Sequence, residues 1–74
     1  MVNNGGDNMK SNELKAARMR IGISQRELAK SINMSNVSYR KKENGNIEFK
    51  RNEIKQLAIV LKLSNEDIIN IFFN

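Results

Sequence analysis

Apolar residues recur along most of this chain at intervals of three and four, which is the spacing of one helix face. The clearest stretch has apolar residues at positions i, i+3, i+4 and i+7: Ile54, Leu57, Ala58 and Leu61. Asn44-Gly45 is a dipeptide found in hairpin turns, but neither flank alternates apolar and polar residues over a strand length. The pattern therefore predicts an all-α fold.

Local start and stop signals divide the chain into five short helices. Ser24 and Ser64 each precede an acid by three residues, the spacing of a capping box. Gly22 and Gly45 are suited to the left-handed residue that ends a helix, and they are expected to end the first and the third helix. The expected helices begin at these residues: Ser11 or Asn12, Ser24, Ser35, Asn52 and Ser64.

Three further expectations concern the segments outside and at the end of these helices. Residues 1–9 are polar and glycine-rich, which predicts a disordered leader before a single domain of residues 10–74. Residues 46–51 are expected to form a loop that is pinned by two apolar side chains, Ile47 and Phe49. In the last helix, the side chains expected to share the inward arc are Ile68, Ile69 and Phe72, whereas Ile71 and Phe73 would project elsewhere.

Composition excludes most enzyme chemistry. The 74 residues contain no His and no Cys, so there is no Ser-His-Asp or Cys-His pair, no zinc site of the usual ligands and no disulfide. We expect no enzyme activity, no metal and no cofactor. Nothing resembles a signal peptide, and no apolar run is long enough to span a bilayer, so we expect a cytoplasmic protein without a membrane partner.

Charge indicates a polyanionic partner. The net charge is +5, and residues 10–62 hold all 13 Lys and Arg with only five of the acids, a net charge of +8 within that stretch. An alternative source of the lysine excess is codon bias, because the chain also has 12 Asn and 9 Ile, whose codons are AT-rich. Charge by itself therefore leaves nucleic-acid binding as one of two interpretations.

The second and third helices are joined by two or three residues, so they must cross steeply, as in a helix-turn-helix unit. Ala29 is the small residue expected where the two backbones approach, and Asn33 tolerates the positive φ of a tight turn. The shared inner face is expected to consist of Leu28, Ile32, Met34 and Tyr39.

A helical wheel separates the two faces of the third helix. With Tyr39 pointing inward, Lys42 and Glu43 fall on the inner side. The outer face has no acid and consists of Asn36, Val37, Arg40, Lys41 and Asn44. Asn can pair with adenine, Arg or Lys with guanine, and Val can contact a thymine methyl group, so this face suits the major groove of DNA.

Residues 14–45 and 54–64 resemble the lambda-repressor-like, Cro-type (XRE-like) helix-turn-helix family. The positions that carry the resemblance are Gly22, Ser24, Gln25, Glu27, Leu28, Ala29, Ser35, Glu43, Asn44 and Gly45. The resemblance implies a compact five-helix DNA-binding domain that often binds a palindromic operator as a homodimer. Two positions depart from the family pattern: Asn33 replaces a glycine, and Lys42 replaces an apolar residue.

The resemblance also implies roles for single residues. Expected to face base edges are Asn36, Val37, Ser38, Arg40 and Lys41, with Ser38 and Arg40 nearer the edge of the surface. Expected to contact phosphate are Ser24, Gln25, Ser35, Lys42 and Asn44. Gln25 would also support the third helix, and Arg18 would form an ion pair with Glu43.

Two sets of basic residues stay open. The stem of Lys42 can cover the core while its ammonium reaches toward phosphate, so the residue is either core or contact. Lys50, Arg51 and Lys55 are either a phosphate-contacting segment or a solvated face.

We therefore expect a small sequence-specific regulator of transcription, similar to phage or mobile-element repressors, that acts by occupying a double-stranded DNA operator. No small-molecule ligand is expected. The alternative is an antitoxin-like interaction module whose apolar C-terminal tail binds a partner protein. RNA binding is a weaker rival, because Tyr39 is needed inside and no aromatic surface remains for stacking on bases.

Overall fold

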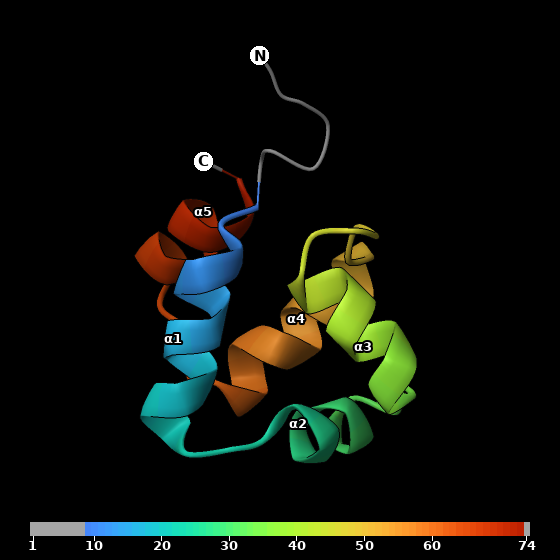
Figure 1. The fold of residues 1–74 in the computed structure, drawn as a ribbon. Helices are drawn as coiled ribbons and strands as arrows, with labels where there is room; N and C mark the ends of the chain where they lie inside the picture. Colours follow the sequence, from blue (N-terminus) through green and yellow to red (C-terminus); the bar gives the residue numbers. More distant parts are fainter. Residues whose placement is uncertain (1–8, 74) are drawn as a thin grey trace.

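A computed structural model describes residues 9–73, which form five α-helices (Figure 1). Their bounds are Ser11–Ile21 (α1), Gln25–Ser31 (α2), Asn36–Glu43 (α3), Arg51–Val60 (α4) and Asn65–Phe72 (α5). No strand occurs within residues 9–73, so the predicted all-α, five-helix fold is confirmed. In the same range, no helix is both long enough and apolar enough to cross a membrane.

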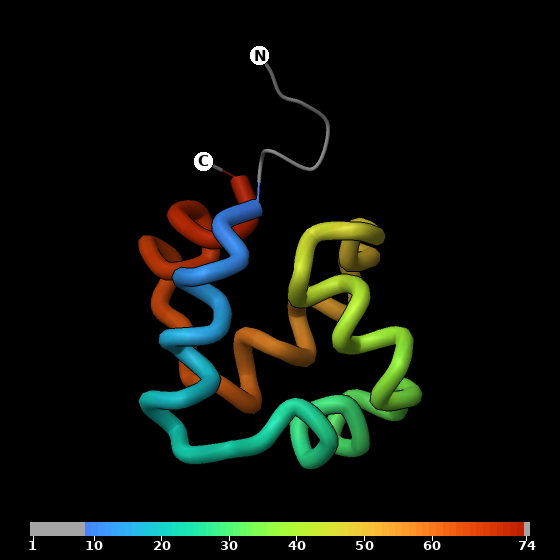
Figure 2. The backbone as a smooth tube through the Cα atoms, viewed as in Figure 1, coloured from blue at the N-terminus to red at the C-terminus, as the bar shows by residue number. Residues whose placement is uncertain are grey.

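The helices surround a single apolar core. α1 and α5 pack side by side, α2 packs against α3, and α4 runs between these two groups (Figures 1 and 2). The buried apolar side chains are Leu14, Ala17, Leu28, Ala29, Ile32, Tyr39, Leu57, Leu61, Ile71 and Phe72. Phe49, from the α3–α4 loop, extends the core between the rings of Tyr39 and Phe72, at centroid distances of 5.9 and 5.8 Å.

Several of the predicted helix ends are present, whereas α4 begins at Arg51, one residue before the expected Asn52. Gly22 and Gly45 have φ values of 82° and 88°, and Asn33 has a φ of 57°, as expected for a tolerated left-handed turn. Ser24 forms a reciprocal capping box with Glu27. Ser64 and Asp67 form the same motif at the start of α5.

Two local predictions are wrong. Ser11 does not cap α1; it lies inside the helix, and its hydroxyl donates to the backbone carbonyl of Glu43 at the end of α3. Ile47 does not pin the α3–α4 loop, because its side chain is exposed, and only Phe49 packs against the core. The larger ring of Phe49 reaches two aromatic rings of the core, which explains why it alone is drawn inward.

The face of α5 also differs from the prediction. Ile71 is buried together with Phe72, and Ile68 is partly buried, while Ile69 is 57% exposed and Phe73 is 64% exposed. Ile68, Ile71 and Phe72 stand at i, i+3 and i+4, which is one helix face. The helix is turned this way because it packs on α1, where the carbonyl of Ile71 accepts the N–H of Lys10 at 2.7 Å.

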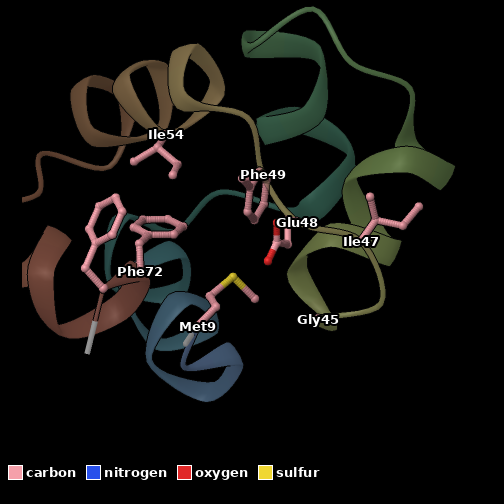
Figure 3. Close-up of a pocket in the computed structure, with 8 residues that line it drawn as sticks. Met9, Gly45, Ile47, Glu48, Phe49, Ile54 and Phe72 are labelled. Atoms are coloured by element: carbon pink, nitrogen blue, oxygen red, sulfur yellow. The ribbon is translucent and has the colours of Figure 1, made fainter. Parts of the chain in front are cut away.

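The predicted leader, residues 1–9, lies outside the described residues except for its last member. Met9 is partly buried and packs against the core. Figure 3 shows it beside Phe49 and Phe72, with Glu48 at the rim of the hollow that these side chains line. Met9 is therefore in contact with the folded domain.

The acids at the helix starts predict acid sensitivity. Hydrogen bonding with Ser24 lowers the pKa of Glu27 below its ordinary 4.5, and hydrogen bonding with Ser64 lowers the pKa of Asp67 below its ordinary 3.8. A carboxyl with a lower pKa in the folded state stabilises the fold above its unfolded pKa, and this contribution is lost as pH falls through the folded value. We expect the melting temperature to be level above about pH 5 and to fall below it.

Melting curves recorded by circular dichroism across the acid range measure this. Glu27→Gln keeps an oxygen that can accept the N–H of Ser24 but cannot titrate, so its melting temperature should fall less steeply with acid than that of the wild type. An identical dependence of melting temperature on pH in the two proteins would show that the Glu27 carboxylate does not contribute to the acid sensitivity.

Candidate nucleic-acid interface

The α2–α3 unit has the short turn and close approach that the sequence predicts. The N–H of Asn33 donates to the carbonyl of Lys30, and the N–H of Met34 donates to the carbonyl of Ala29 at 2.8 Å. Ala29 is 1% exposed, which places the small side chain at the packed side of α2. The turn sends α3 steeply away from α2 (Figure 1).

α3 has one buried face and one exposed face. Tyr39, Lys42 and Glu43 are buried, so the inward direction assigned to Tyr39 is correct. The exposed residues of α3 and its C-cap are Asn36, Val37, Arg40, Lys41 and Asn44, and Ser38 is half-buried at their edge. This exposed face has two cations, amides and one methyl-bearing side chain, and the only acid of the helix is turned inward.

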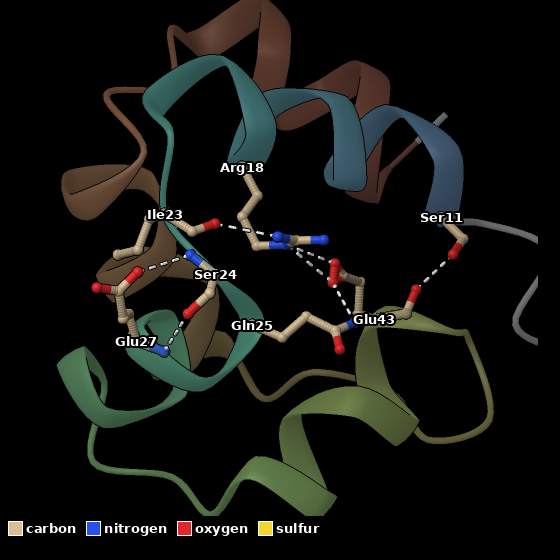
Figure 4. Close-up of polar contacts among 7 residues, drawn as sticks. All are labelled: Ser11, Arg18, Ile23, Ser24, Gln25, Glu27 and Glu43. Atoms are coloured by element: carbon tan, nitrogen blue, oxygen red, sulfur yellow. Dashed lines mark hydrogen bonds and ion pairs between the residues drawn. The ribbon is translucent and has the colours of Figure 1, made fainter.

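A buried carboxylate fastens three helices together at the end of α3 (Figure 4). Glu43 has no exposed surface, and its carboxylate accepts from Nε of Arg18 in α1 at 2.9 and 3.2 Å and from Nε2 of Gln25 in α2 at 3.0 Å. Arg18 Nη1 also donates to the carbonyl of Ile23 at 3.0 Å. The expected ion pair is therefore present, and it fixes how α3 sits on α1 and α2.

The polar residues at the helix starts act first as caps. The hydroxyl oxygens of Ser24 and Ser35 accept the N–H groups of Glu27 and Ser38, at 3.0 and 3.1 Å. An accepting hydroxyl still has its own hydrogen to donate, so capping leaves each serine able to contact a phosphate oxygen. Gln25 is bound to Glu43, which matches its expected supporting role, and its contact with phosphate stays a prediction.

Lys42 requires a correction, because its expected role as a phosphate contact does not fit its position. The residue is 9% exposed, and its ammonium donates to both carboxylate oxygens of Glu53, at 2.8 and 2.9 Å. A cation in the interior is stable only when it is paired, and Glu53 at the start of α4 provides the partner. The sequence pattern did not predict Glu53 as the partner of Lys42. Its position as the acid in the first turn of α4 was the available signal.

The hydroxyl of Tyr39 is the exception in this well-paired region. It is buried, and no hydrogen bond of good geometry is found for it among residues 9–73, although the charged groups of Glu43 and Arg18 lie near it. Burial, followed by the negative charge of Glu43, raises the pKa of Tyr39 above its ordinary value, so the hydroxyl is protonated at neutral pH. The ring, and not the hydroxyl, therefore holds this residue in the core.

We expect Tyr39→Phe to leave the free energy of unfolding unchanged or to raise it by up to about 2 kcal/mol, since an unpaired buried hydroxyl is removed while the ring contact with Phe49 is kept. Urea denaturation followed by circular dichroism measures the change. A loss of more than about 1 kcal/mol would show that the hydroxyl has a stabilising partner.

A groove with apolar walls lies between α4 and α5. Its apolar lining consists of Phe49, Ile54, Ala58, Ile59, Ile68 and Phe73. Ile59 is 78% exposed, and Phe73 is 64% exposed. No cluster of metal-ligating side chains is found in the part of the chain that the structure describes.

Comparison with known families gives one match. The family model HTH_3, described as helix-turn-helix, matches residues 14–68, a span that runs from α1 into α5 and includes the whole α2–α3 unit. Comparisons with curated proteins and with solved structures found no match.

Proposed function

The chain belongs to the lambda-repressor-like, Cro-type helix-turn-helix family, and from this premise we propose that it represses transcription by occupying a DNA operator. Members of this family are DNA-binding regulators and are not typically enzymes. Occupancy is the simplest mechanism for a small domain: a protein bound over a promoter excludes RNA polymerase.

One observation carries the proposal, namely the exposed face of α3. It combines Arg40 and Lys41 with amide and methyl groups, has no acid, and is held in place by the buried carboxylate of Glu43. We propose that this face enters the major groove, where its residues meet base edges: Asn36, Val37, Ser38, Arg40 and Lys41.

Phosphate contacts would come from the residues around this face. We propose Ser24, Gln25, Ser35 and Asn44, all at the ends of α2 and α3. Because such contacts release counterions, affinity should fall steeply as salt rises.

Repression can be separated from mere binding with a promoter assay. A promoter that contains a bound sequence over the polymerase site is transcribed in vitro with increasing protein. The proposal predicts that transcript falls in parallel with operator occupancy, measured by footprinting in the same samples. Unchanged or increased transcript at full occupancy would contradict repression.

We further propose that the operator is palindromic and that the protein binds it as a homodimer, with α5 in the contact. Ile69 and Phe73 are large, exposed and about one helical turn apart, which fits a two-fold, self-complementary surface. The test is sedimentation of the wild type and of Ile69→Ser/Phe73→Ser, with and without operator DNA. Both side chains are exposed, so the variant should keep its fold. On operator DNA the wild type should have the mass of a bound dimer and the variant a smaller mass. Equal masses of the two protein–DNA complexes would contradict this interface.

A second candidate function is supported by the groove between α4 and α5. Its exposed apolar rim, with Ile59 and Phe73, would suit an antitoxin-like module that binds a partner protein. This alternative predicts that the protein enriches no sequence from random DNA and that Ile59→Ser abolishes binding to the partner.

A further inference from the structure

The ion pair between Lys42 and Glu53 joins the end of α3 to the start of α4. Lys42 lies in the last turn of α3, and Glu53 lies in the first turn of α4. The side chains are 11% and 15% exposed, so water screens the pair little. The α3–α4 loop lies between the two partners, and the pair therefore holds the two ends of this loop together.

The same carboxylate also organises the start of α4. Oε1 of Glu53 accepts the backbone N–H of Lys50 at 2.8 Å in addition to the ammonium of Lys42. Burial acts to raise the pKa of Glu53, but hydrogen bonds from Lys42 and Lys50 and the charges of both lysines bring it below its ordinary 4.5. The carboxylate is therefore charged at neutral pH and bound to both segments.

Exposed basic residues lie next to this pair on both α3 and α4. Lys50 and Arg51 are exposed and stand directly at the start of α4, whereas the charge of Lys42 is neutralised inside. Arg40 and Lys41 on α3 are exposed as well, so the pair links two exposed cationic segments through a buried contact.

We propose that the Lys42–Glu53 pair is a positioning device for DNA binding: it holds the start of α4 against α3, so that Lys50 and Arg51 meet the DNA backbone while α3 occupies the groove. This proposal rests on the proposed function. Lys42 and Glu53 would touch no DNA themselves and would act through the residues that they hold in place.

The test is the double variant Lys42→Met/Glu53→Gln, which leaves the net charge at +5. Met keeps the unbranched stem in the core, and Gln keeps an oxygen for the N–H of Lys50. Replacing a buried ion pair by apolar or neutral groups is commonly neutral or stabilising, so the variant should melt at or above the wild-type temperature.

DNA affinity is measured for a selected duplex over a range of salt concentrations. For the wild type, Arg51→Gln should reduce the slope of log K against log salt by about 1, the value for one lost phosphate contact. The double variant should reduce the slope by about 1 or more without any change in net charge, and Arg51→Gln should then add little further loss. A purely structural ion pair would leave the slope unchanged in a folded variant.

Lys62→Gln is the matched control, because it removes one exposed charge after the far end of α4 and should leave the slope unchanged in both backgrounds. Glu53→Asp keeps every charge but shortens the reach to Lys42, and the same fall in slope is expected, which tests the proposal if the double variant does not fold. Two results would overturn the proposal. One is a wild-type slope in either folded variant, and the other is that Arg51→Gln lowers the slope equally in the wild type and in the double variant. A wild type that binds no duplex would instead overturn the proposed function and this role with it.

Discussion

Replacing Glu43 with alanine is expected to destabilise the fold by about 3–5 kcal/mol, the usual effect of removing one partner from a buried ion pair. The carboxylate has no exposed surface and accepts from Arg18 and Gln25, so its loss leaves the guanidinium of Arg18 without its anion in a site that is only 14% exposed. Since small domains are typically stable by about 5–15 kcal/mol, this loss is a considerable fraction of the total stability, and the melting temperature of the variant should lie well below that of the wild type.

Urea and thermal denaturation, followed by helical circular dichroism, measure this loss. Glu48→Ala is the matched control, since Glu48 is an exposed acid in the α3–α4 loop, and its change should stay within about 0.5 kcal/mol. A loss below about 1 kcal/mol for Glu43→Ala would mean that apolar packing alone orients α3.

Replacing Lys41 with alanine is expected to reduce discrimination between a selected operator and random DNA by about 1–3 kcal/mol, the range for a base contact. Lys41 is exposed on the face of α3 opposite Tyr39, and it has no ion pair or hydrogen bond to another side chain within residues 9–73. Its ammonium is therefore free to meet a guanine edge, so its loss should act on preference more than on binding to random sequence.

Competition binding with selected and scrambled duplexes, at one salt concentration, measures the ratio of the two affinities. Lys62→Gln controls for the loss of one charge at a site remote from α3 and should leave the ratio unchanged. If Lys41→Ala weakens both duplexes equally, Lys41 contacts phosphate, and the face of α3 is rotated relative to the groove.

The helices themselves were predictable, because their signals are local. Capping serines and the residues that tolerate positive φ, such as Gly22 and Asn33, act within one turn of chain. The orientation of α5 was not predictable in this way, since several of its residues are apolar and only packing on α1 selects Ile71 over Ile69.

Within the candidate site, the wheel placed the exposed face of α3 correctly because one large residue, Tyr39, had to point inward. The environment of Lys42 could not be derived, since its partner Glu53 lies on another helix and their meeting depends on the course of the loop. The hydrogen bond from Ser11 to the carbonyl of Glu43 was not predictable for the same reason, because the two residues lie on different helices, α1 and α3.

Selection of bound duplexes from a random pool is the most direct test of whether α3 reads a DNA sequence, because a very large number of operator sequences compete in one experiment. We expect enrichment of a defined sequence with two-fold symmetry, and loss of preference at single positions when Lys41 or Asn36 is replaced by alanine. Recovery of unenriched sequence by a folded protein would contradict it, and α3 would not be a base-reading helix.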